Sequence, residues 1–170
     1  LRCGYTSFTL RAPHPEEDFA RAAKTFSVSY QAAGDGRLWD LFYTSIPSAE
    51  TIEAYLDAAE ADRAAGRALP FVVVERASER VVGATRYMRM HKADRRLEIG
   101  GTFYAQSVQR TAVNTECKLL LLRHAFETLG AQLVGWRTDN FNHASQRAIE
   151  RLGAKRDGVI RHHALRRDGT

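Results

Sequence analysis

Apolar and polar residues alternate along several stretches of this chain, and this period of two is typical of β-strands. Residues 5–11, YTSFTLR, alternate in this way and predict a first strand. Three strand-like runs follow one another in the middle of the chain. They are 69–77 (LPFVVVERA), 79–90 (ERVVGATRYMRM) and 95–105 (RRLEIGGTFYA). Two further strands are predicted over residues 131–139 and 154–165.

Apolar residues at three- and four-residue spacing predict four helices. The first, over 15–33, opens on a proline and three acidic residues, which favour a helix N-terminus. The second covers 49–66, with Ser48 as its cap and a terminating glycine. The third is leucine-rich, over 114–129, and the fourth covers 141–152. A glycine follows each of these last two helices directly, as expected at a helix end.

The order of elements is therefore strand, helix, helix, three strands, helix, strand, helix, strand. Consecutive strands pair most readily as an antiparallel meander, whereas a strand–helix–strand unit makes a parallel crossover. This order predicts an α/β (α+β) fold with a mixed, mostly antiparallel central sheet flanked by about four helices. The sequence shows no repeat, low-complexity tract or linker, so residues 1–170 are read as a single domain.

Composition is that of an ordinary globular protein, with 44% hydrophobic and 26% charged residues. No run of about 18 apolar residues is present, which argues against a membrane span. The net charge of +5 suits either nucleic acid or an anionic small molecule. Basic residues cluster only in RHHALRR, over 161–167, without interleaved aromatic residues. This distribution argues against nucleic acid as the partner.

The cysteines and histidines point to no disulfide framework and no metal. Cys3 and Cys117 lie far apart without a CxxC motif, as expected of a protein from the reducing cytoplasm. The N-terminal residues lack the basic-then-apolar layout of a signal peptide. Without an HExxH motif or clustered ligands, His162 and His163 are read as surface residues and no metal is predicted.

The stretch SVQRTAVNT, residues 107–115, leads directly into the leucine-rich helix. A helix start offers backbone N–H groups without intrahelical partners, together with partial positive charge, and so can bind a phosphate. Such loops usually carry glycines, and this one has none. Ala112 supplies low bulk instead, and Asn114 tolerates a left-handed backbone. The loop is either an anion-binding loop or a polar helix cap.

A pair of glycines interrupts the strand before this loop. Glycine weakens a strand interior unless it marks a bulge or a close approach of the backbone to a ligand. Strict alternation would place Leu97, Ile99, Gly101 and Phe103 on one face of LEIGGTFY. Glu98, Gly100, Thr102 and Tyr104 would then share the other face.

A glycine-interrupted strand, a polar loop, and a helix followed by DNFNHASQRAIERLGA (139–154) resemble the GNAT-superfamily N-acetyltransferases. The likeness is to the branch of the ribosomal-protein N-terminal acetyltransferases RimJ and RimL, and it spans residues 5–168. In that family the signature Q/R-x-x-G-x-G/A cradles the pyrophosphate of acetyl-CoA. Here it falls on residues 109–114, with Ala and Asn in place of the two small residues.

The resemblance implies acetyl-CoA as the cofactor and a site for it. Backbone groups near Phe103 and Tyr104 would hold the pantetheine, and Asn142 would bind its amide unless it only caps its helix. The loop residues would bind the pyrophosphate. They are Gln109, Arg110, Thr111, Ala112, Val113, Asn114 and Thr115.

The resemblance also implies direct attack of a primary amine on the thioester, without an acyl-enzyme. The amine must lose a proton, and Glu98 is the candidate base, alone or through water. The alternative is a strand glutamate paired with Arg86 or Arg96. Ser145 is the candidate acid, or a hydrogen-bonding group, for the leaving thiolate. Cys117 is read as a packing residue because direct transfer needs no nucleophilic thiol.

The acceptor amine, a peptide N-terminus or a small molecule, would lie against the loop between the first two helices. Its candidate residues are Trp39, Phe42, Tyr43 and Thr44, with Tyr87 from the third strand. The family fold implies one more strand after the last residues, and its absence would leave an edge that a second copy could cover, giving a homodimer. The competing hypotheses are an acyl-CoA-binding protein without turnover and a basic ribosome- or RNA-associated protein.

Overall fold

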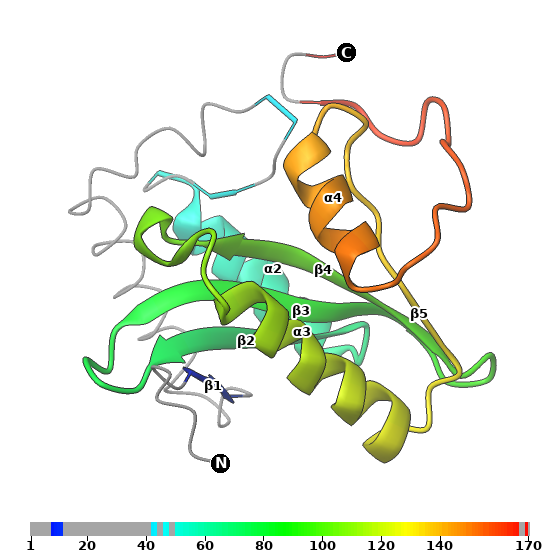
Figure 1. The fold of residues 1–170 in the computed structure, drawn as a ribbon. Helices are drawn as coiled ribbons and strands as arrows, with labels where there is room; N and C mark the ends of the chain where they lie inside the picture. Colours follow the sequence, from blue (N-terminus) through cyan, green and yellow to red (C-terminus); the bar gives the residue numbers. More distant parts are fainter. Residues whose placement is uncertain (1–7, 12–41, 44–45, 48–49, 167–168, 170) are drawn as a thin grey trace.

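The computed structural model describes residues 8–11, 42–43, 46–47, 50–166 and 169. A five-stranded sheet with the order β1-β2-β3-β4-β5 forms its centre (Figure 1). The strands are β1 (Phe8–Arg11), β2 (Ala68–Glu75), β3 (Val81–His91), β4 (Arg96–Tyr104) and β5 (Leu133–Gly135). The helices are α2 (Ile52–Ala64), α3 (Val113–Arg123) and α4 (His143–Arg151), with the 3₁₀ turn η1 (Gln106–Val108) and the π-helical turn η2 (His124–Thr128).

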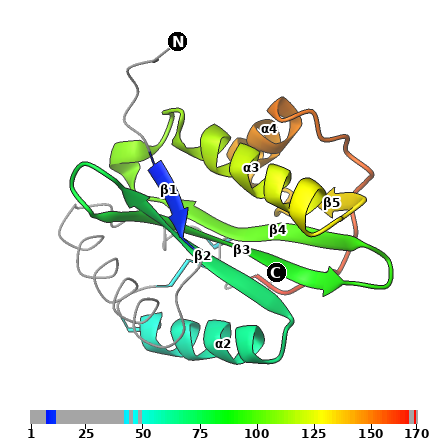
Figure 2. The ribbon, with the colours of Figure 1, turned by 90° about the horizontal axis from the view of Figure 1, so that it is seen from below.

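The strand directions confirm the predicted mixed sheet. β1, β2, β3 and β4 pair antiparallel in chain order, and β5 returns parallel to β4 after the crossover through α3. Figure 2 shows α2 on one face of the sheet and α3 and α4 on the other. The sheet is thus covered on both faces, as expected of a three-layer α/β arrangement.

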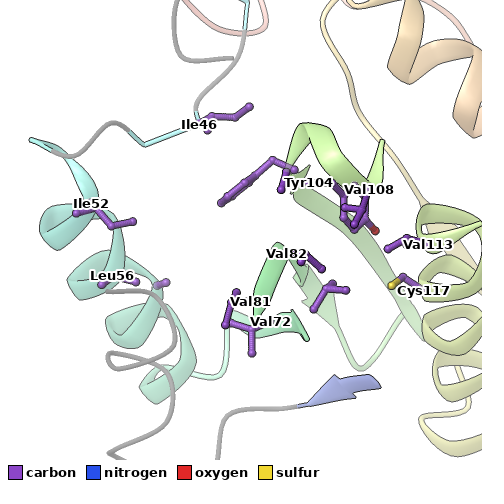
Figure 3. Packing of buried hydrophobic residues seen from close by; sticks show 14 residues of the cluster. Ile46, Ile52, Leu56, Val72, Val81, Val82, Tyr104, Val108, Val113 and Cys117 are labelled. Atoms are coloured by element: carbon purple, nitrogen blue, oxygen red, sulfur yellow. The ribbon is translucent and has the colours of Figure 1, made fainter. Parts of the chain in front are cut away.

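The main core runs through the sheet from α2 to α3. Ile52 and Leu56 of α2 are buried against the same hydrophobic cluster as Val72 of β2 and Val81 of β3 (Figure 3). On the other face the cluster is completed by residues at the start of α3. A second cluster packs β4 against the end of α3 and η2. Both helix layers are therefore fixed by apolar burial, the main stabilising term in folding.

The paired glycines of β4 form a β-bulge. The sequence had suggested either a bulge or a close approach of the backbone to a ligand. The register changes from Ala84↔Phe103 to Arg86↔Gly100, and Gly101 has the left-handed φ of +56°. Because one extra residue is inserted, the alternation reverses at the bulge. The predicted division of faces is therefore wrong beyond Gly100.

Contacts on either side show the reversal. Ile99 belongs to the cluster beneath α3, and Thr102 hydrogen-bonds a side chain of α3. Phe103, by contrast, packs edge-on against Tyr55 of α2, with 6.3 Å between ring centroids. Ile99 and Thr102 thus share the α3 face, and Phe103 lies on the α2 face.

β4 and β5 stay paired over only three residues. Their register is Arg96↔Leu133, Leu97↔Val134 and Glu98↔Gly135, after which β5 ends while β4 continues to Tyr104. At the far end of β4, the Ala105 N–H donates to the Val82 carbonyl of β3 at 2.8 Å. By the alternation of an antiparallel pair, the backbone groups of Tyr104 point away from β3, toward the edge that β5 has left.

The predicted helix over 15–33 lies outside the described residues, as does Ser48, the predicted cap of the second helix. The second helix begins at Ile52 with Thr51 at its N-cap position, later than predicted, and ends before Gly66, whose φ is +69°.

The predicted last strand over 154–165 is wrong. These residues form no strand, and Val159, Ile160 and Leu165 are 63%, 66% and 84% exposed. A strand needs a neighbour to pair with, and the three-residue β5 offers little length for one.

We predict that Gly83→Ala destabilises the fold. A Cβ at this position would lie 2.5 Å from Cδ1 of Tyr104 and 2.7 Å from the carbonyl oxygen of Phe103, and a backbone neighbour cannot easily move. The expected loss is about 1–3 kcal/mol in the free energy of unfolding, measured by chemical denaturation. Gly158→Ala is the control because nothing lies within 4 Å of its added Cβ, and equal stability of the two variants would contradict the prediction.

Candidate active site

Several of the predicted site residues lie on the elements that border the divergence of β4 and β5. Tyr104 ends β4, the loop of residues 109–112 joins η1 to α3, and α4 starts at His143, shortly after β5. Arg151 of α4 donates to Thr115 of α3, with 3.2 Å between Nη2 and Oγ1. The described part of the chain thus places a stretch of β4 that β5 does not pair with, one helix start and a second helix around the same divergence (Figure 1).

The loop before α3 is held by its own side chains. Gln109 donates from Nε2 to the Tyr104 carbonyl at 3.0 Å, which ties the loop to the outer edge of β4. Arg110 has a φ of +60°, so the left-handed position of this loop is taken by an arginine. Thr111 donates to the Val108 carbonyl at 2.7 Å and accepts from the Val113 N–H at 3.3 Å. The threonine hydroxyl therefore caps the helix.

Asn114 is not the left-handed residue that the sequence suggested. It lies in the first turn of α3, after Ala112, which has an ordinary helical φ of −66°, and Val113, which is buried. The first-turn N–H groups of Asn114 and Thr115 have no intrahelical partner by the geometry of any α-helix. They stay directed to the N-terminal side of α3, where the helix carries partial positive charge.

Asn142 and Ser145 are linked to each other at the start of α4. The side-chain oxygen of Asn142 accepts from the Ser145 N–H at 3.0 Å, so Asn142 is the N-cap. The cap uses the oxygen only, and Nδ2 can still donate. Ser145 is half-buried in the first turn of α4.

Glu98 lies where β4 and β5 separate, opposite Gly135 in the last residue pair. Its Oε2 accepts from Arg89 at 2.8 Å, and its Oε1 lies 2.9 Å from Nη2 of Arg137. The alternative suggested from the sequence, an ion pair of Glu98 with Arg86 or Arg96, is wrong in its partners. Arg86 stacks over Tyr55 at 4.8 Å, and Arg96 pairs with Asp94 at 3.3 Å.

Tyr87 does not belong to the acceptor surface. It is fully buried in the cluster under α3, where its hydroxyl donates to the Leu121 carbonyl at 2.6 Å. Burial raises the pKa of this phenol to about 12. Phe42 is 38% exposed and meets Tyr43 edge-on at 5.2 Å between ring centroids. Trp39 and Thr44 lie outside the described residues.

Cys117 packs as predicted. It is 1% exposed, and burial raises the pKa of its thiol. The neighbouring Tyr104 hydroxyl is buried and has no hydrogen-bond partner among the described residues, and burial likewise raises its pKa. A thiol held neutral in this way is a poor nucleophile, which fits direct transfer.

Lys118 is a feature that the sequence pattern did not reveal. Its ammonium group is buried, with Nζ 2.6 Å from Thr102 Oγ1 and 3.3 Å from Thr85 Oγ1. The two threonine hydroxyls also bond each other at 2.8 Å. Burial without a carboxylate among these partners lowers the pKa of Lys118 to about 7. A lysine within an apolar helix pattern is normally expected at the surface. This contact depends on the β-bulge, which turns Thr102 toward α3, and the sequence pattern did not predict that reversal.

Two more cations missed by sequence reasoning lie after β5 and near the C-terminus. Arg137 contacts Glu98 and also His163, at 3.0 Å from Nη1 to Nε2. Arg166 pairs with Asp139 at 2.7 Å. These contacts join residues far apart in the sequence, and no local pattern announces them.

Comparison with known proteins agrees with this architecture. The model of the acetyltransferase (GNAT) domain matches residues 7–155. A structure from Chromobacterium violaceum, described as a probable acetyltransferase of the GNAT family, has a TM-score of 0.76 at 27% identity. It covers 94% of this chain and 76% of its own. No curated protein matches the chain.

Two more distant structures share the fold. RimJ of Mycobacterium smegmatis, in complex with CoA-disulfide, has a TM-score of 0.65 at 20% identity, covering 90% of this chain and 72% of its own. A chimera of the spermidine N-acetyltransferase SpeG from Vibrio cholerae has a TM-score of 0.70 at 14% identity, covering 93% and 86%.

These findings show that the chain is an acyltransferase, and more specifically an N-acetyltransferase. The chain belongs to the GNAT acetyltransferase family. In the part of the chain that the structure describes, no helix is long and apolar enough to cross a membrane. The same residues contain no group of three or more His, Cys, Asp or Glu side chains that could hold a metal ion.

We predict that Lys118 makes stability rise with pH. Its pKa is about 7 in the folded chain and near 10.5 when unfolded, so the unfolded state binds more protons between these values. The free energy of unfolding therefore gains up to about 1.4 kcal/mol per pH unit from this group across that window. Below pH 7 the full cost of burying the charge remains.

Lys118→Met removes this dependence and should be more stable than the wild type at pH 7. The Thr85–Thr102 hydrogen bond can persist without the lysine. Denaturation of both proteins at pH 7 and pH 9 measures the difference, with exposed Lys155→Met as the control. If the stability gap between wild type and Lys118→Met does not narrow as the pH rises, the buried amine is not the cause.

Proposed function

We propose that this chain is an acetyl-CoA-dependent N-acetyltransferase of the RimJ/RimL-like branch that transfers acetyl to a primary amine by direct attack. The observation that carries the proposal is the edge of β4. Beyond Glu98 this edge is left by β5, and it faces the start of α3 across the Gln109–Tyr104 hydrogen bond. Unpaired strand groups beside a helix N-terminus suit a ligand with an amide chain at one end and a phosphate at the other.

The residues present fit the pantetheine part of acetyl-CoA. The outward backbone groups of β4 near Tyr104 can pair with an amide as an added strand would. Asn142, at the start of α4, keeps Nδ2 as a donor. Directly after β5, Nε1 of Trp136 is a buried donor that lacks a partner among the described residues.

The residues before α3 fit the pyrophosphate. The N–H groups of Asn114 and Thr115 point to the N-terminal side of the helix, and Arg110 adds a positive charge on an exposed side chain. Ala112 has an ordinary backbone conformation, so the loop does not need glycine at that position. The left-handed position falls on Arg110, where the side chain can contribute charge as well.

When bound, acetyl-CoA supplies the acetyl group as a thioester. Transfer forms an N–C bond at the acceptor amine, breaks the C–S bond and leaves CoA as a thiol, so one proton must leave the amine and one must reach the sulfur. An α-amino group with a pKa of about 8 is mostly protonated at pH 7, which makes a proton acceptor useful. A backbone N–H of β4 near Tyr104 would donate to the thioester oxygen as negative charge develops there.

Glu98 is the proposed proton acceptor, acting through water. It sits at the divergence, and each of its oxygens keeps a lone pair beyond the arginine contact, since a carboxylate oxygen can accept more than once. Arg89 and Arg137 fix its orientation. Ser145, in the first turn of α4, would hydrogen-bond the leaving sulfur.

The acceptor would lie on the aromatic side of the site. Phe42 and Tyr43 come from the segment before α2, and Phe42 also lies 5.8 Å from Phe141, centroid to centroid, just before α4. These rings join the segment before α2 to the cap of α4. Solved structures that share this fold are named for different acceptors, spermidine for SpeG and a ribosomal protein for an acetyltransferase from Vibrio cholerae. A shared fold alone therefore does not select between a peptide N-terminus and a small amine.

A non-catalytic acyl-CoA-binding role is the second candidate. The observation in its favour is that both oxygens of Glu98 are engaged by arginines. A protein of this kind would bind CoA with the same loop and strand edge without releasing thiol in the presence of amines.

Thiol release from acetyl-CoA is the test of the proposed function. Purified chain is incubated with acetyl-CoA and a panel of amino-acid amides, dipeptides, polyamines and aminoglycosides. We expect amine-dependent thiol release with at least one class, since the site offers an acceptor surface beside the strand edge. Calorimetry with CoA separates the outcomes. Binding without release supports the non-catalytic role, and absence of both rejects the two candidates together.

Glu98→Gln tests the proton acceptor. Loss of the base should lower kcat about 100-fold or more at pH 7, with partial recovery toward pH 9 as free amine becomes abundant. Arg89→Gln is the matched control because it removes one ion pair and keeps the carboxylate. Wild-type activity of Glu98→Gln across pH 6–9 would show that another group takes the proton.

A further inference from the structure

Arg166 is seated in a small cluster of a carboxylate and two aromatic rings. Its Nε lies 2.7 Å from Oδ2 of Asp139. Its guanidinium carbon is 4.7 Å from the ring centroid of Phe141 and 6.0 Å from that of Phe42. Figure 1 shows the C-terminal segment, in red, reaching the described residues 42–43 across the top of the molecule.

These groups are the ones that recognise an organic cation. A carboxylate supplies charge, and aromatic faces attract a cation through their quadrupoles, more strongly when water is partly excluded. Asp139 is 19% exposed in its side chain. Its other oxygen, Oδ1, accepts from the Phe141 N–H at 2.8 Å, which fixes the carboxylate beside that ring. The cluster is therefore built before any ligand arrives.

Polar contacts, rather than apolar burial, hold the segment that brings Arg166 into the cluster. Residues 155–165 are all exposed, so apolar burial contributes little to holding them. Among the described residues, Arg166 contacts Asp139 and His163 contacts Arg137 at the end of the segment. At its start, Arg156 donates to Gln146 and Glu150 of α4.

The Arg166–Asp139 pair is partly buried, with side-chain exposures of 23% and 19%. A ligand cation in the place of Arg166 would find the same carboxylate and the same rings as partners, so it can compete for this position.

Arg137 connects the cluster to the proposed proton acceptor. Asp139 follows Arg137 by two residues, a span of at most about 7 Å along the backbone. Arg137 in turn contacts Glu98 at 2.9 Å. An acceptor whose amine approaches Glu98 could therefore place a second positive group on Asp139.

We propose that Asp139, Phe42 and Phe141 form a binding site for a cationic group on the acceptor, and that Arg166 occupies this site in the free enzyme. The acceptor class is thus an amine with a second positive charge several ångströms away, as in a peptide with a basic side chain or a polyamine. This proposal rests on the proposed acetyltransferase function. It goes beyond that function by naming what selects the acceptor.

The test compares two acceptors that differ only in charge. Ala-Arg-amide and Ala-citrulline-amide have the same size and reactive α-amine, but citrulline carries a neutral urea in place of the guanidinium. For the wild type we expect a KM at least threefold lower with Ala-Arg-amide. Arg166→Ala should lower that KM a further three- to tenfold while leaving the citrulline value within twofold.

Asp139→Asn should remove the preference. Asparagine keeps the oxygen that accepts from the Phe141 N–H and loses the charge, so the KM for Ala-Arg-amide should rise about tenfold toward the citrulline value. Phe141→Leu should weaken the same preference in part. Arg161→Ala is the control, because it removes an exposed positive charge from the same segment and should change neither KM.

Direct binding keeps this proposal separate from the proposed function. Calorimetry titrates Ala-Arg-amide into wild type, Arg166→Ala and Asp139→Asn, without acetyl-CoA. Tighter binding to Arg166→Ala and loss in Asp139→Asn support the site even if no acetyl transfer is found, in which case only the proposed function fails. If the enzyme is active but the variants change the KM equally for the arginine and citrulline peptides, the cation site is wrong and the proposed function stands. The same holds if the wild type shows no preference between the two peptides.

Discussion

Buried backbone N–H and C=O groups in a folded protein need hydrogen-bond partners. The proposed site of this chain depends on the point at which β4 loses β5 as its pairing strand. β5 pairs with β4 for three residues and then leaves, while β4 continues to Tyr104 along an edge that no other described strand pairs with. The Gln109 side chain takes one of them and ties the loop before α3 to the strand edge. Strand edge, loop and helix start are thus parts of one structure, in which the proposed CoA site follows from incomplete pairing of the sheet.

The bulge at Gly100–Gly101 decides which side chains surround that edge. By reversing the alternation it turns Thr102 toward α3, where it meets the buried Lys118, and Phe103 toward α2. Burial of an amine costs free energy that a methionine would not, so stability alone does not explain it. Lys118 instead links α3 to both β3 and β4, through the hydroxyl groups of Thr85 and Thr102.

Local patterns predicted much of the fold because each element satisfies its own periodicity and capping. The antiparallel meander and the parallel crossover were predicted from element order, and Gly66 and Gly130 end their helices with φ of +69° and +65°. Sequence patterns failed where contacts with residues distant in the sequence determine whether a residue is buried or paired. Tyr87 is buried although aromatic residues often line sites, and residues 154–165 form no strand because pairing needs a neighbour. The partners of Glu98 depend on Arg89 and Arg137 converging, which spacing does not encode.

Amide hydrogen exchange with and without CoA tests the central claim most directly, because it reports which backbone groups the ligand protects. The account predicts slower exchange at residues 99–104 and 110–117 when CoA is bound, with little change in α2. Binding that protects other segments and leaves these two unchanged would contradict the assignment of the β4 edge and the α3 start as the CoA site.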